Sequence, residues 1–133
     1  MKRFCQYLSL VFASLFLVVA LSYAQNTISS GAVLEGFVLD KNNKNFPMVV
    51  NIEWIDNATG NFKGNVSWPS LNSVHRIEGR LTVNTITFKE VSYIKQGGAH
   101  LNCVYALIIE GSSLDGRWVE PGIDRGIVQL KIK

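Results

Sequence analysis

The chain has 133 residues and a formal net charge of +3, from 13 Lys and Arg against 10 Asp and Glu. Two of the basic residues, Lys2 and Arg3, stand in an N-terminal segment that we expect to be removed, which leaves 11 basic against 10 acidic residues. Because the remaining net charge of +1 comes without any cluster of Lys or Arg, the composition argues against nucleic acid as a partner.

Residues 1–24 have the three parts of a secretory signal peptide. The charged start is followed by an apolar run from Leu8 to Leu21 and then by Ser22-Tyr23-Ala24, a small-x-small cleavage site. The apolar run is shorter than the roughly 20 residues of a membrane-spanning helix. We therefore expect cleavage after Ala24, a secreted or periplasmic product with no membrane attachment, and one domain over residues 25–133.

The rest of the chain alternates apolar and polar residues with period two, which is typical of half-buried β-strands. The clearest unit is the stretch from Pro47 to Trp68, where two alternating runs flank Asp56–Asn61, a segment rich in residues that favour chain reversal. The expected strands, in chain order, cover residues 32–39, 48–54, 62–68, 74–83, 85–94, 103–110, 114–119 and 126–132.

The alternation also predicts which side chains face inward. His75 is in phase with the apolar face of its strand, and Glu90 and Ser92 are in phase with Ile86 and Phe88. The remaining inward-facing residues expected on these strands are Met48, Val50, Ile52, Trp54, Phe62, Val66, Trp68, Ile77, Leu81, Val83, Ile94, Cys103, Tyr105, Leu107, Ile109, Leu114 and Trp118.

Eight short strands joined by turns, with no room for crossover helices, favour an antiparallel up-and-down meander. A meander of this length avoids open edges by closing, which predicts an all-β fold with an eight-stranded β-barrel. Inward-phase glycines at 64, 79 and 116 favour the barrel, because strong coiling needs positions without a Cβ atom. The alternative is a two-sheet β-sandwich.

The connections of an up-and-down barrel alternate between its two rims, and the longer ones here, residues 40–46, 69–73, 95–102 and 120–124, fall on the same rim. Binding barrels usually carry function at such a mouth. The inward phase brings six residues there, and we expect them to form a candidate ligand-binding site: Trp68, His75, Glu90, Ser92, Cys103 and Trp118. The opposing interpretation is that these side chains only close the end of a barrel whose interior is filled.

Glu90 is the inward carboxylate expected to matter most. An acid turned toward an apolar interior must be paired, hydrogen-bonded or neutral. Counting from the turn at Asn84 places Glu90 opposite residues 77–81, at least two residues short of His75. Barrel stagger would bring the two together, and Tyr105 offers a further partner.

Cys103 is the only cysteine after the signal segment, so no intrachain disulfide is possible and we expect a buried thiol. A thiol nucleophile with His75 or His100 as its base would lack an orienting group and an oxyanion element. Two His and one Cys also lack the spacing of a metal site, and no phosphate-binding glycine loop is present, so no metal or cofactor is expected.

The sequence therefore predicts a monomeric, non-enzymatic module that binds a small apolar or aromatic ligand, or a peptide, at the long-loop mouth. A structural or protein-interaction domain with a filled core is the alternative function. The third class of function is a thiol or carboxylate hydrolase. Hydrolytic turnover that is abolished by Cys103→Ser or Glu90→Gln would support it.

Five segments carry a resemblance to known proteins: Trp68-Pro69-Ser70-Leu71, Ile77-Glu78-Gly79-Arg80-Leu81, Ile86-Thr87-Phe88-Lys89-Glu90, Cys103, and Leu114-Asp115-Gly116-Arg117-Trp118. Together they resemble a group of small exported bacterial β-domains of uncharacterised function. That group has another Cys where this chain has Ser73, Val74 and His75, so the family's disulfide is not expected here. The hairpin Gly60-Asn61-Phe62-Lys63-Gly64 is more distantly similar to those of avidin-like and lipocalin-like barrels, the calycins, which implies a barrel but no particular activity.

Overall fold

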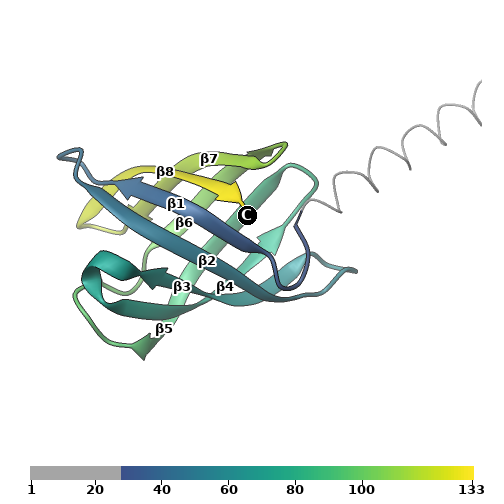
Figure 1. Cartoon of the computed structure of the whole chain (residues 1–133), viewed down its shortest axis with the longest axis horizontal. Helices are drawn as coiled ribbons and strands as arrows, with labels where there is room; N and C mark the ends of the chain where they lie inside the picture. The colour runs from purple at the N-terminus through teal and green to yellow at the C-terminus, as the bar shows by residue number, and fades with distance from the viewer. Residues whose placement is uncertain (1–27) are drawn as a thin grey trace, which may run out of the picture.

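The computed structural model describes residues 28–133, so the signal-peptide prediction for residues 1–24 lies outside the described part of the chain. Eight strands follow one another around a closed antiparallel barrel (Figure 1). They are β1 (Val33–Leu39), β2 (Asn45–Ile55), β3 (Asn61–Trp68), β4 (Ser73–Leu81), β5 (Thr85–Lys95), β6 (Val104–Glu110), β7 (Ser113–Glu120) and β8 (Asp124–Ile132), with a short 3-10 helix, η1 (Pro69–Leu71), after β3.

The barrel closes where β1 pairs antiparallel with β8, from Leu34 opposite Ile132 to Leu39 opposite Ile127. The predicted up-and-down barrel is therefore confirmed, and the two-sheet sandwich is wrong. The strands β2 and β8 begin earlier than predicted, at Asn45 and Asp124. Within residues 28–133, no helix is both long and apolar enough to cross a membrane.

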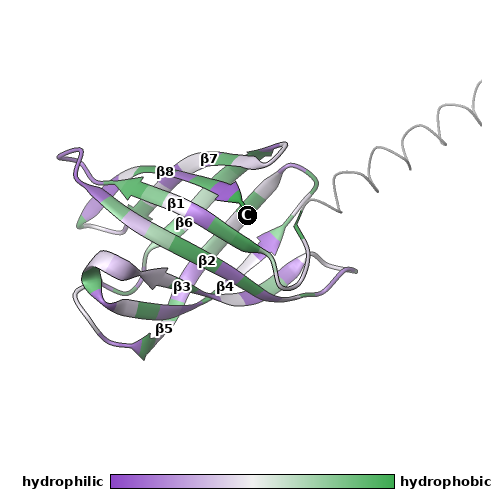
Figure 2. Cartoon of the chain, viewed as in Figure 1, coloured by the Kyte–Doolittle hydropathy of each residue, from purple (hydrophilic) through white to green (hydrophobic). Residues whose placement is uncertain are grey.

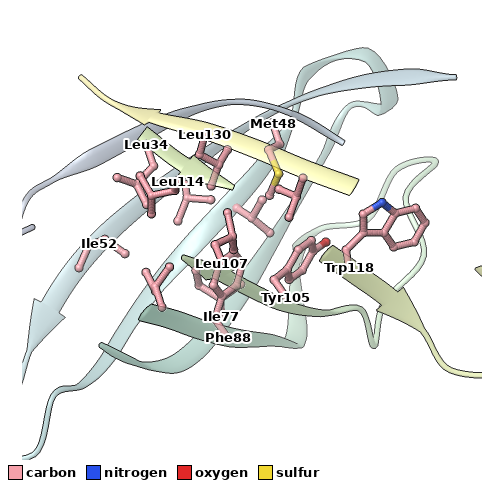
Figure 3. Packing of buried hydrophobic residues seen from close by; sticks show 14 of the residues in the cluster. Leu34, Met48, Ile52, Ile77, Phe88, Tyr105, Leu107, Leu114, Trp118 and Leu130 are labelled. Carbon is pink, nitrogen blue, oxygen red and sulfur yellow. The ribbon is translucent and has the colours of Figure 1, made fainter. Parts of the chain in front are cut away.

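Period-two alternation builds the core, because successive side chains of a strand point to opposite faces. Figure 2 shows apolar and polar residues alternating along the strands, and Figure 3 shows the inward apolar side chains packed together. Leu34, Met48, Ile77 and Leu114 have almost no exposed surface. At the three inward glycines predicted to allow coiling, a Cβ atom would lie about 2 Å from a carbonyl oxygen of the neighbouring strand.

Register shifts between β2 and β3 and between β4 and β5 change the predicted phase. The pairing of β2 with β3 shifts between Ile52 and Trp54, so Ile55 turns inward and Trp54 is 53% exposed on the outer face. In β5, Glu90 pairs with Ile77, but Ser92 pairs with Arg76, which places Ser92 on the outer side of the barrel. The inward predictions for Trp54 and Ser92 are therefore wrong, because each bulge adds one unpaired residue and flips the alternation that follows. The inward predictions for Ile94, which follows the bulge in β5, and for Val83, which lies beyond the end of β4, are wrong as well, since these side chains are 48% and 45% exposed.

Candidate functional site at the long-loop mouth

Four connections meet at one end of the barrel, at the left of Figure 1. They are residues 40–44, 69–72, 96–103 and 121–123, and the opposite rim has residues 56–60, 82–84 and 111–112. The longest of these connections, residues 96–103, lies at the same end as residues 40–44, 69–72 and 121–123, as predicted. We call this end the mouth.

A buried carboxylate lies just below the mouth. Glu90 is 4% exposed and receives hydrogen bonds from two other parts of the chain: the indole Nε1 of Trp68, 3.3 Å from Oε2, and the backbone N–H of Cys103, 3.2 Å from Oε1. Nδ1 of His75 contacts Oε2 as well. The predicted inward orientation of Glu90 and its contact with His75 are both confirmed, and these partners satisfy a polar group that burial removes from water.

Two polar atoms beside this carboxylate have no hydrogen-bond partner among the described residues. They are Nε2 of His75 and the hydroxyl of Tyr105, and both side chains are almost completely buried. The Tyr105 ring stacks on Phe88, with ring centroids 4.5 Å apart, and Figure 3 shows its hydroxyl directed from the core toward Trp118. Buried polar groups normally have a hydrogen-bond partner, so two buried polar atoms without one, both close to Glu90, are unusual.

Cys103 is a free, buried thiol, as predicted. Burial, and after it the negative charges of Glu90 and Glu120, raise the pKa of this thiol far above its usual range. Burial also raises the pKa of Tyr105, and Glu90 adds to the effect. Both groups therefore stay protonated at neutral pH, and a protonated thiol is a poor nucleophile.

A pocket of about 290 Å³ opens above this cluster, between Trp68 and Trp118. Phe46 and Tyr105 complete its aromatic wall, and smaller apolar groups come from Val38, Leu71, Ala99 and Cys103. The charged and titratable residues around it are Asp40, Lys44, His100, Glu120 and Asp124. The interior is therefore not filled up to the mouth.

Hydrogen bonds fix the walls of the pocket. Nε1 of Trp118 donates to the carbonyl oxygen of Leu39 at 2.9 Å, across the barrel closure. Gly126 allows this contact, because a Cβ atom there would lie 1.7 Å from the same oxygen. On the other side, the backbone N–H of Ala99 donates to Oγ of Ser73 at 3.0 Å, which fastens the 96–103 connection to the start of β4. The pocket is thus largely preformed, as ligand sites usually are.

Three of the six predicted site residues, Trp68, Cys103 and Trp118, line the pocket. His75 and Glu90 do not line it, but Glu90 holds Trp68 and the backbone of Cys103 in place. Ser92 lies on the outer face, for the reason given above.

Glu120 was missed by the sequence-based interpretation, which ended its strand at residue 119. The signal was present, since the inward phase of Leu114, Gly116 and Trp118 continues to residue 120. Glu120 is 8% exposed, and its Oε1 lies 3.1 Å from Nδ1 of His100. A second carboxylate therefore lies close to the pocket.

A wider depression of about 600 Å³ lies on the outer surface around Trp54 and Val104. Most of its lining consists of outward-facing side chains such as Lys63 and Lys89. The mouth is the better candidate site, because the buried polar atoms without partners are found beside it and not beside the outer depression.

In the part of the chain that the structure describes, no three His, Cys, Asp or Glu side chains are grouped so that they could hold a metal ion. The comparisons with known proteins add no functional assignment to this geometry: no protein-family model matches the chain, and no curated protein is significantly similar to it.

Proposed function

We propose that this protein is a secreted, non-enzymatic module that binds one small molecule with an aromatic or apolar body at the mouth of the barrel. The observation that carries the proposal is the preformed pocket of about 290 Å³ between Trp68 and Trp118. A cavity of roughly 150 Å³ already holds benzene in an engineered protein. The pocket at the mouth therefore has room for an aromatic ring with a substituent.

The state of the nearby polar groups supports binding over catalysis. Cys103 has a raised pKa and keeps its proton. Glu90 already accepts hydrogen bonds from Trp68 and from the backbone of Cys103, and it contacts His75. A general base needs a free lone pair within reach of substrate, and Glu90 is not among the residues that line the pocket.

A titration with single-ring aromatic probes, followed by backbone amide NMR shifts, tests the proposal. We expect the shifts to concentrate at Ala99, Cys103 and Trp118. Leu71→Trp should reduce binding by filling the pocket, whereas Leu81→Trp, on a half-buried residue at the opposite rim, should not. The proposal fails if no probe shifts the resonances of the mouth, or if both variants bind as the wild type does.

A further inference from the structure

We infer that the ligand of the mouth is a small organic cation, whose positively charged group sits beside Glu120 and against the aromatic walls of the pocket. This inference rests on the proposed function and specifies the chemical class of the ligand. Charge, aromatic geometry and an unsatisfied buried hydroxyl support it independently.

The charge around the pocket is negative. Three carboxylates, Asp40, Glu120 and Asp124, line it against the single ammonium group of Lys44. Glu120 is the most buried of the three acids. Its hydrogen-bond partner within residues 28–133 is His100, whose side chain is 69% exposed. A carboxylate that is nearly buried and only weakly paired favours a cation at the same place.

The negative field of the mouth also acts on a neighbouring group. Burial is the main cause of the raised pKa of the Cys103 thiol, and Glu90 and then Glu120, which lie close enough to add to it, place two acids near this wall of the pocket. Clefts lined by one sign of charge concentrate ligands of the opposite sign. An anionic ligand would have to overcome this field.

The aromatic walls suit a cation as well. The indole N–H groups of Trp68 and Trp118 are both engaged, with Glu90 and with the carbonyl oxygen of Leu39, so what these side chains can offer a ligand is their ring surface. Aromatic faces attract cations through their quadrupole, and Trp does so most strongly. The mouth already contains one such pair, since Nζ of Lys44 lies 5.2 Å from the centre of the Phe46 ring.

The Tyr105 hydroxyl is the third observation. Tyr105 lines the pocket and is almost completely buried, and its hydroxyl makes no hydrogen bond of normal geometry within the described residues, although Cys103 and Glu90 lie close to it. A phenol oxygen carries lone pairs in addition to its proton, so it can accept a hydrogen bond from a ligand N–H. A primary or secondary ammonium group would satisfy this acceptor and Glu120 together, which a purely apolar ligand cannot do.

Three probes of similar size and different charge test the inference: benzylammonium, its neutral isostere ethylbenzene, and benzenesulfonate. With the purified protein at low salt, we expect the cation to bind about tenfold more tightly than the neutral probe, as expected for one partly buried charge contact. Benzenesulfonate should bind the most weakly. Glu120→Gln should weaken binding of the cation about tenfold and leave the binding of ethylbenzene unchanged.

The matched control is Glu110→Gln, an exposed acid at the opposite rim, which should not change the affinity for any probe. If Glu120→Gln does not fold, the comparison of the three probes on the wild-type protein decides alone. Equal or tighter binding of the neutral or anionic probe at the mouth would overturn the cation inference and leave the proposed function standing. Absence of amide shifts at the mouth with all three probes would overturn both.

Discussion

Removing the Glu90 carboxylate should destabilise the barrel strongly. In Glu90→Ala, the indole N–H of Trp68 and the backbone N–H of Cys103 lose their acceptor inside the core, and Nδ1 of His75 loses its partner. A buried donor left without a partner costs about 1–3 kcal/mol. Three groups lose their partner, and the side chains around them can relax in part. We therefore expect the free energy of unfolding to fall by about 3–5 kcal/mol, which is also the range for breaking a buried ion pair.

Urea denaturation followed by tryptophan fluorescence measures this change. With a slope of about 1.5 kcal/mol per molar urea for a small domain, the midpoint should fall by roughly 2–3 M. Glu90→Gln keeps one acceptor oxygen and should fall between the wild type and the alanine variant. Glu110→Ala, on an exposed acid, should change the free energy by less than about 0.5 kcal/mol.

A Glu90→Ala midpoint equal to that of Glu110→Ala would refute the reasoning. It would mean that Glu90 does not carry the hydrogen bonds of Trp68 and Cys103 in solution. The phase of β5, and with it the position of Glu90 below the mouth, would then be wrong.

Three further predictions follow from the packing and the titrating groups. Gly126→Ala should lower the free energy of unfolding by more than about 2 kcal/mol, because the new Cβ atom would lie 1.7 Å from the Leu39 carbonyl oxygen. In the control Gly98→Ala, the new Cβ atom would lie 3.5 Å from its nearest neighbour, so the urea midpoint should change little. Equal midpoints of the two variants would contradict this packing. Since the raised pKa keeps the folded Cys103 thiol protonated while the unfolded thiol ionises above pH 9, stability should decline between pH 9 and pH 10, by up to about 1.4 kcal/mol per pH unit. Cys103→Ala should remove this part of the decline, and an identical pH profile of the two proteins would count against it. Trp54→Phe should change stability by less than about 0.5 kcal/mol and should remove the most red-shifted tryptophan emission, because Trp54 is exposed; a large loss of stability would mean that Trp54 packs in the core.

Several features of the barrel could be predicted from the sequence because they depend on neighbours along the chain. Alternation with period two and turn residues between the runs are local signals, and they indicated eight strands, their order and the closed barrel. The same alternation runs unbroken from Ile86 to Glu90, which is why the sequence was enough to identify Glu90 as an inward carboxylate. The alternation of loops between rims then predicted where the mouth would lie.

The bulges and the composition of the pocket were decided only by the tertiary structure. The bulges that turned Trp54 and Ser92 outward arise where the registers of paired strands have to match around a closed ring, and no residue type marks those positions in the sequence. The meeting of Lys44, His100 and Glu120 around one pocket depends likewise on the stagger of the strands and on how the long connections cross the rim. Local periodicity fixes the face to which a side chain points, but only the closure of the barrel fixes which side chains from distant strands share a site.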